Sequence, residues 1–148
     1  QPQQSEVISE DSSYKMIYMM RSVIDGGTGS RIRSRYNLRC DMGGKTGTTN
    51  NNSDCWFMGY TPSLVSGVWV GGEDRDIHFD TMTFGQGAAS GLPVWALYMQ
   101  KVFADKSLGY DESERFDIPE GWSPCGNEDD FSGSVNEMRE HSSDNIFN

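Results

Sequence analysis

Three short strand-like runs separated by turn residues constrain the fold of this chain more than any other feature. The runs are GKTGTT at 44–49, DCWFMGY at 54–60 and LVSGVWVG at 64–71. The segments between them, NNNS at 50–53 and TPS at 61–63, are rich in residues that form tight turns. Strand-like runs joined by turns this short pair with their neighbours in antiparallel order. The sequence therefore predicts a three-stranded antiparallel meander.

The side chains of this meander are large on both sets of alternating positions. In the second and third runs these are Trp56, Met58, Val68 and Val70, with Phe57 and Trp69 opposite them. A strand that is apolar on both faces is typical of a sheet covered on both sides. We therefore expect both faces to be covered. We also expect Trp56, Trp69 and Trp95 to be core residues rather than a carbohydrate-binding platform.

Two helices are expected to flank the sheet, which makes the fold class α+β. The first spans about 11–25, with Asp11, Ser12 or Ser13 as its cap and Gly26-Gly27 as its stop. Its apolar residues recur at helical spacing and predict one buried stripe: Met16, Ile17, Met19, Met20, Val23 and Ile24. The second spans roughly 88–104, with one apolar face: Leu92, Trp95, Ala96, Met99, Val102 and Phe103. One further short strand is expected around 77–79.

Composition divides the chain into three parts. Residues 1–10 form a polar lead-in, 11–119 the folded portion, and 120–148 an acidic tail in which 126–148 are expected to be disordered. The net charge is −10, although seven cations and only two anions lie between residues 14 and 49. Overall acidity argues against a nucleic-acid partner. No apolar run is long enough for a membrane span.

The cysteines and histidines do not predict a metal site. Cys40, Cys55 and Cys125 form no C-x-x-C pair, and His78 and His141 have no ligand spacing around them. One disulfide with a leftover thiol and three free thiols both remain open. The acidic residues between 73 and 76 are expected to be a solvated loop, and no cofactor is predicted.

The lysine in GGKTGTT offers chemistry that the rest of the chain does not. Lys45 supplies a positive charge, Thr46 and Thr48 supply hydroxyl donors, and Gly47 leaves room for a ligand backbone. A strand with these groups suits a peptide-like substrate that ends in a carboxylate.

The run GKTGTTNNNSDCWFMGYTPSLVSGVWVGGED at 44–74 resembles the C-terminal part of the transpeptidase domain of bifunctional (class A) penicillin-binding proteins. K-T-G, with S-x-x-K and S-D-N, is the signature of these proteins and of related β-lactamases. The likeness extends back through MIYMMRSVIDGGTGSRIR and forward through FGQGAASGLPVWALYMQKVF, over roughly 14–119. It implies three strands of a larger five-stranded sheet, and hence an incomplete domain in which the third strand, 64–71, has an unpaired hydrophobic edge that favours aggregation.

The resemblance also implies roles for individual residues. Family enzymes attack the D-Ala–D-Ala end of a peptidoglycan stem peptide with a serine and form an acyl-enzyme, which also explains their reaction with β-lactams. By this analogy Lys45 sets the electrostatics around the nucleophile. The hydroxyls of Thr46 and Thr48 bind the terminal carboxylate beside Gly47, and the backbone N–H of Thr48 is an oxyanion-hole donor.

The nucleophile segment is not evident in this chain. SSYK at 12–15 and SDN at 143–145 match family motifs by letter. In the family, however, S-x-x-K comes far upstream of K-T-G, and S-x-N lies between them. SSYK instead falls on the helix directly before the K-T-G strand, and SDN falls in the tail. We interpret SSYK as a helix cap with a solvated lysine and predict that the chain alone is inactive.

The leading hypothesis is therefore part of a peptidoglycan D,D-transpeptidase. Its parent would act on the periplasmic or outer face of the bacterial inner membrane, held there by a segment outside this chain. Two alternatives remain: a related serine β-lactamase or D,D-carboxypeptidase, and a non-catalytic cell-wall interaction module. DCWFMGYTP counts against the first alternative, because those enzymes share K-T-G without this continuation.

Overall fold

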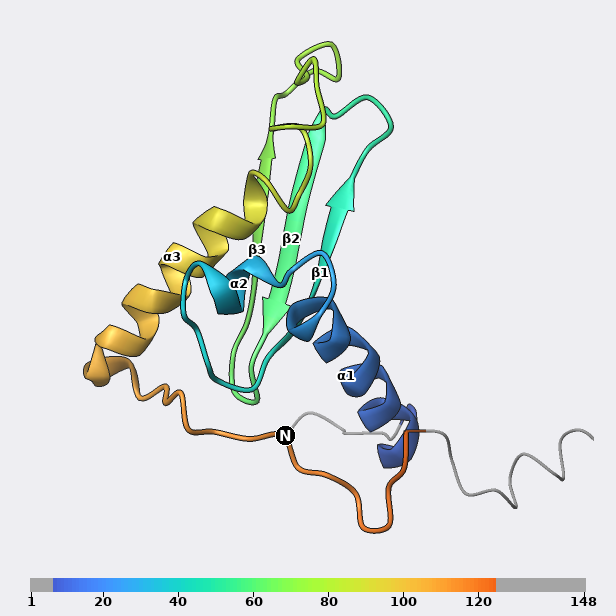
Figure 1. Ribbon diagram of the computed structural model, residues 1–148, viewed down its shortest axis with the longest axis vertical. Helices are drawn as coiled ribbons and strands as arrows, with labels where there is room; N and C mark the ends of the chain where they lie inside the picture. The colour runs from blue at the N-terminus through green and yellow to red at the C-terminus, as the bar shows by residue number, and fades with distance from the viewer. Residues whose placement is uncertain (1–6, 125–148) are drawn as a thin grey trace, which may run out of the picture. The chain divides into compact units, whose positions relative to one another are not determined.

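The computed structural model describes residues 7–124. In chain order the elements are α1 (Glu10–Asp25), α2 (Arg31–Ser34), β1 (Gly43–Thr48), β2 (Asp54–Tyr60), β3 (Val65–Gly71), α3 (Gly91–Ala104) and the 3-10 helix η1 (Lys106–Leu108) (Figure 1). Two compact units are distinguished. Residues 16–117 form the larger unit, and the described part of the smaller one combines residues 7–15 with 118–124. Each unit is described by itself.

The sheet is the predicted antiparallel meander, with strand order β1-β2-β3. The register pairs Lys45 with Met58 across β1 and β2, and Phe57 with Val68 across β2 and β3. β2 has the predicted bounds, while β1 and β3 each differ by one residue at one or both ends. The turn residues between the runs therefore predicted the topology correctly.

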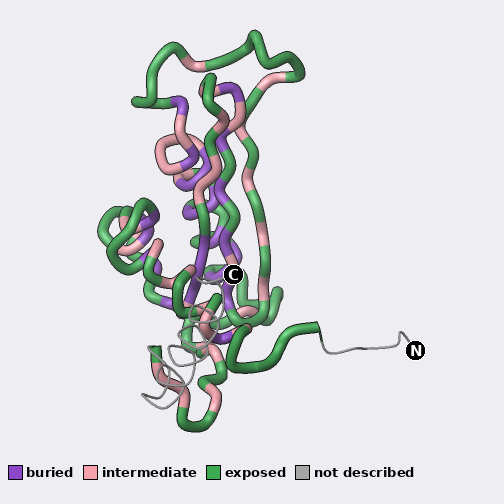
Figure 2. The backbone as a smooth tube through the Cα atoms, turned by 90° about the vertical axis from the view of Figure 1, so that its right-hand side faces the viewer, coloured by how far each residue is buried: buried purple, intermediate pink, exposed green. Residues whose placement is uncertain are grey.

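Only one face of this sheet is covered by the elements described. Cys55 and Phe57 are fully buried on the face that packs against α3. Buried and exposed residues alternate along the middle of β2 (Figure 2). On the other face Trp56, Met58 and Trp69 are 44%, 43% and 45% exposed. The expectation that both faces are covered is therefore wrong for residues 7–124.

The placement of the tryptophans follows from the register. Trp56 pairs directly with Trp69, so both rings lie on the face away from α3, with centroids 6.4 Å apart. The prediction that they are core residues is wrong for this pair. It is correct for Trp95, which is fully buried on α3. Trp95 meets Phe57 edge to face at 5.2 Å and donates its indole N–H to Ser66 Oγ at 2.8 Å.

Helix α3 begins three residues later than predicted, because residues 86–90 form a turn. The N–H groups of Ala89 and Ser90 both donate to the carbonyl of Gln86, at 2.8 and 3.1 Å. From Gly91 onward the predicted apolar face is buried, which makes α3 the main cover of the sheet.

Helix α1 was predicted to within one residue, but two of the six residues in its predicted buried stripe are exposed, while Ile17, Met20 and Val23 are half-buried. Ile24 is fully buried, but Met16 and Met19 are 51% and 54% exposed. Its start is also one residue earlier than expected, with Ser9 Oγ accepting from the N–H of Ser12 at 3.3 Å. In the smaller unit, Tyr14 is buried and meets the ring of Trp122 at 4.7 Å.

Several smaller features differ from the sequence predictions. Residues 77–79 form no strand, because the N–H of Ile77 closes a turn on Asp74 and that of Phe79 donates to Asn52. The short helix α2 was not predicted. Cys40 and Cys55 are free and buried. Cys125 and the tail predicted to be disordered, 126–148, lie outside the described residues. Within residues 7–124 no helix is long and apolar enough to cross a membrane.

Candidate functional site

The outer edge of β1 carries the K-T-G residues. The N–H of Thr49 donates to the carbonyl of Asp54 at 3.1 Å, which makes these two residues a hydrogen-bonded pair. Such pairs alternate along an antiparallel ladder, so Lys45 and Gly47 bond toward β2. The backbone N–H and C=O groups of Thr46 and Thr48 therefore point outward. In the described part of the chain no strand pairs with this edge.

Lys45 brings a positive charge to the same edge. Its side chain leaves β1 on the exposed face of the sheet and is itself exposed. The ammonium Nζ donates to the carbonyl of Thr46 at 2.8 Å. Because that carbonyl points outward, the ammonium lies at the open edge rather than over the sheet. This position allows it to interact with an anion bound along β1.

Thr46 has a hydroxyl neighbour that sequence reasoning missed. Thr28 Oγ1 lies 3.4 Å from Thr46 Oγ1, although the two residues are 18 positions apart. Thr28 belongs to the GGTGS loop between α1 and α2, which the sequence analysis treated only as a helix stop. A threonine between two glycines gave no signal, because the approach of this loop to β1 is a tertiary contact.

Thr48 is held from the opposite side by the loop before α3. The backbone N–H of Gly87 donates to Thr48 Oγ1 at 3.1 Å. Gly87 is buried so closely over the ladder that a Cβ there would lie 2.1 Å from the Trp56 carbonyl oxygen. The loop at 86–90 is thus seated on β1 and β2 and fixes the rotamer of Thr48. The hydroxyl proton of Thr48 remains able to donate.

The other candidate motif within the described residues lies on α1. In SSYK at 12–15, Lys15 Nζ forms an ion pair with Asp11 at 2.8 Å, one helical turn away. The SDN motif at 143–145 lies outside the described residues.

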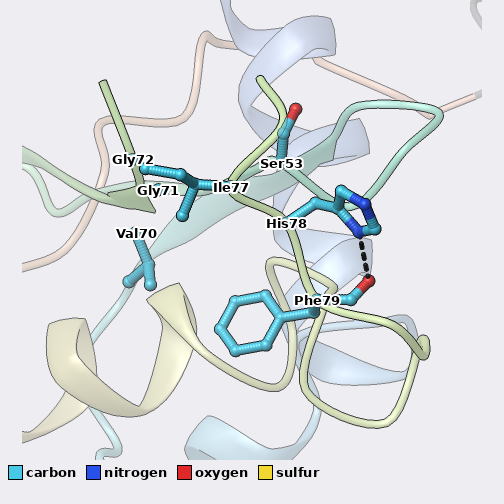
Figure 3. Close-up of a pocket in the computed structure, with 7 residues that line it drawn as sticks. All are labelled: Ser53, Val70, Gly71, Gly72, Ile77, His78 and Phe79. Carbon is cyan, nitrogen blue, oxygen red and sulfur yellow. Dashed lines mark hydrogen bonds between the residues drawn. The ribbon is translucent and has the colours of Figure 1, made fainter. Parts of the chain in front are cut away.

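A small pocket lies elsewhere in the larger unit. Its cavity volume is about 160 Å³, and its lining is Ser53, Val70, Gly71, Gly72, Ile77, His78 and Phe79 (Figure 3). The His78 imidazole is exposed, and its Nδ1 lies 3.3 Å from the Phe79 carbonyl. Ser53 Oγ is engaged with Thr49 and Asp54. Within 7–124 no group of three acidic, histidine or cysteine side chains could hold a metal ion.

The chain shares sequence with several curated proteins. It is 37% identical over 105 residues to penicillin-binding protein 1A of Pseudomonas aeruginosa, covering 69% of this chain and 12% of that protein. It is 37% identical over 99 residues to penicillin-binding protein 1B of Escherichia coli, covering 66% and 11%. This chain is homologous to penicillin-binding proteins 1A and 1B. No family model matches it.

The comparison with solved structures leads to the same family as the comparison of sequences. The crystal structure of penicillin-binding protein 1A from Haemophilus influenzae matches 77% of this chain with a TM-score of 0.64 and 29% identity. The three-stranded sheet and its helices match the penicillin-binding protein 1A transpeptidase fold, of which the chain is an incomplete piece. It spans only 17% of that chain and 11–12% of the two curated relatives above.

Proposed function

We propose that this chain is part of a peptidoglycan D,D-transpeptidase and contributes the strand that binds the end of the stem peptide. The observation that carries the proposal is the open outer edge of β1. There the Lys45 ammonium, the Thr46 hydroxyl and the backbone N–H of Thr48 are presented together. An extended peptide laid along an unpaired edge gains main-chain hydrogen bonds, and a cationic group beside it favours a terminal carboxylate.

Each group has a distinct role in this proposal. Lys45 stabilises negative charge near the attacking serine and on the substrate carboxylate. The hydroxyls of Thr46 and Thr48 donate to that carboxylate, beside Gly47. The N–H of Thr48 is one donor to the oxyanion that forms when the acyl carbon is attacked, an effect worth about 3 kcal/mol in comparable sites. β-Lactams carry the corresponding carboxylate and acyl carbon and bind in the same way.

The attacking serine comes, in this proposal, from a segment outside residues 1–148, and the chain alone is inactive. The ion pair between Lys15 and Asp11 supports this interpretation, because a lysine paired with a carboxylate is a poor acceptor for a serine proton. The site of action is the extracytoplasmic side of the bacterial inner membrane, where peptidoglycan is assembled.

A chimaeric protein tests the proposal directly. Residues 14–119 of this chain replace the corresponding segment of the Pseudomonas aeruginosa relative, and a fluorescent penicillin reports covalent acylation on a denaturing gel. We expect the chimaera to label. Lys45→Ala should slow its acylation on the order of 100-fold. Lys101→Ala, at an exposed lysine on α3, is the matched control and should label normally.

The unmodified chain provides the second arm of the test. We expect no penicillin-specific band on residues 1–148 alone. A band that Ser12→Ala abolishes would show that the nucleophile is in α1 and would overturn the fragment interpretation. A folded chimaera that labels equally well with and without Lys45 would overturn the role of β1.

A further inference from the structure

The Thr28 hydroxyl lies beside the K-T-G strand without belonging to it. Thr28 Oγ1 and Thr46 Oγ1 are 3.4 Å apart, and the Thr28 side chain is exposed. The Lys45 ammonium is on the carbonyl of Thr46, at the same strand edge. Within residues 7–124, the side chains of Thr28, Thr46 and Lys45 contact hydroxyl and carbonyl oxygens and no carboxylate. Two hydroxyls and an ammonium group therefore lie at one strand edge, and no carboxylate of the described residues neutralises the positive charge.

The loop that carries Thr28 is held closely against the end of α1. The N–H of Gly29 donates to the carbonyl of Val23 at 2.8 Å. A Cβ at residue 27 would lie 2.9 Å from Val23 Cα, and one at residue 29 would lie 2.9 Å from the buried Ile24 Cδ1. The two glycines therefore let the loop approach so closely that any side chain would push it away. Thr28 is fixed before any ligand arrives.

The hydrogen-bond inventory of the pair leaves donor capacity for a ligand. Each threonine hydroxyl has one proton, and at 3.4 Å only one of the two can donate to the other, through a long contact. The second proton has no acceptor within the pair. A carboxylate has two oxygens and only accepts, so each hydroxyl can donate to one oxygen. Both protons are then used in charge-assisted bonds, which are stronger than the contact they replace.

We propose that Thr28 is a second hydroxyl donor to the carboxylate that β1 binds, so that the ligand is held by Thr28 and Thr46 together. The ligand class is a peptide or β-lactam with a free carboxylate. This inference rests on the proposed function, and it extends the site from one strand to the loop between α1 and α2. Thr28 reaches the ligand directly and is a binding residue rather than a support for Thr46.

An NMR titration of the isotope-labelled chain tests this proposal. The probes are N-acetyl-D-alanyl-D-alanine and its C-terminal amide, which lacks the charged carboxylate. The readout is the dissociation constant from the backbone amide signals of residues 44–48. We expect Thr28→Val to weaken binding of the acid about five- to tenfold and to weaken binding of the amide by a smaller factor, because the neutral amide has one acceptor oxygen in place of two. Thr28→Ser keeps the hydroxyl and should bind like the wild type.

Controls separate this inference from its alternatives. Thr83→Val removes an exposed hydroxyl from the loop before α3 and should change nothing. The buried Trp95 indole signal reports whether each variant is folded. If Thr46→Val weakens acid binding and Thr28→Val does not, Thr28 is only a structural tie, and the proposed function stands without it. If the wild-type chain shows no shifts at residues 44–48, the proposed role of β1 fails, and the role of Thr28 fails with it.

Discussion

Gly87 allows the sharpest test of how the K-T-G strand is supported, because a methyl group added there by substitution with alanine would clash with backbone atoms of β1 and β2. The new Cβ would lie 2.1 Å from the Trp56 carbonyl oxygen and 3.0 Å from that of Gly47. Both oxygens belong to the ladder between β1 and β2 and cannot move as a side chain can. The loop at 86–90 must therefore recede by roughly 1 Å to restore ordinary contact.

The expected loss of stability has two parts. Overpacking of a close contact costs typically about 1–3 kcal/mol. A displacement of this size also breaks the bond from the Gly87 N–H to Thr48 Oγ1, which adds about 1 kcal/mol. The total is about 2–4 kcal/mol. With a urea m-value of about 1.5 kcal/mol/M, the unfolding midpoint falls by ~1.3–2.7 M. Far-UV circular dichroism at low protein concentration measures it.

The same substitution elsewhere provides the control. A Cβ on Gly26 would meet nothing within 4 Å. Gly26→Ala should be neutral, or stabilise the fold by up to about 1 kcal/mol through the lower entropy of the unfolded chain. Thr48→Val isolates the hydrogen bond and should cost about 1–2 kcal/mol, while Thr48→Ser should cost less. Equal midpoints for Gly87→Ala and Gly26→Ala would refute the reasoning, since only their surroundings differ.

Two further predictions concern the core thiol and the exposed face of the sheet. Burial raises the pKa of the Cys40 thiol to about 11, an effect that Arg33 partly offsets. An unfolded thiol ionises near pH 8.5, so stability is retained below that pH and falls by up to about 1.4 kcal/mol per pH unit until the folded thiol ionises. Urea unfolding of wild type and Cys40→Ala at pH 8 and 10 should differ accordingly, and parallel curves would contradict this. Replacing both Trp56 and Trp69 by serine should reduce self-association in light scattering and change the urea midpoint little, and unchanged association would mean that another surface is responsible.

The sequence predicted the connectivity of the fold better than its burial. Turn residues at 50–53 and 61–63 predicted the meander because turn chemistry is local. The burial of Trp56 and Trp69 was predicted wrongly because strand periodicity separates two faces without saying which one is covered. The register, a tertiary property, places both rings on the face away from α3. The predicted burial of Met16 and Met19 was wrong for a similar reason: helical spacing shows which residues share a face of the helix, and not which face packs against the rest of the protein.

The candidate site was predicted in part for a related reason. Lys45, Thr46 and Thr48 lie on one contiguous strand, so their spacing was visible in the sequence. Thr28 and Gly87 reach that strand from loops 18 and 39 residues away from their partners. Neither contact has a sequence signature, because both depend on how closely glycine-rich loops can approach a ladder. A motif search finds the strand and misses the groups that hold it.

The exposed face of the sheet is consistent with the finding that this chain matches only part of a related structure. Trp56, Met58 and Trp69 form a contiguous apolar patch on the same side of the sheet as the Lys45 side chain. A stable soluble domain rarely leaves two adjacent tryptophans nearly half exposed on one face of a sheet. The chain matches only 17% of the length of a related solved structure, whose remaining length offers ample material to cover this face. A polypeptide seated there would also lie beside Lys45. The same contact would then bring further groups to the open edge of β1, beside those that the described residues already present there.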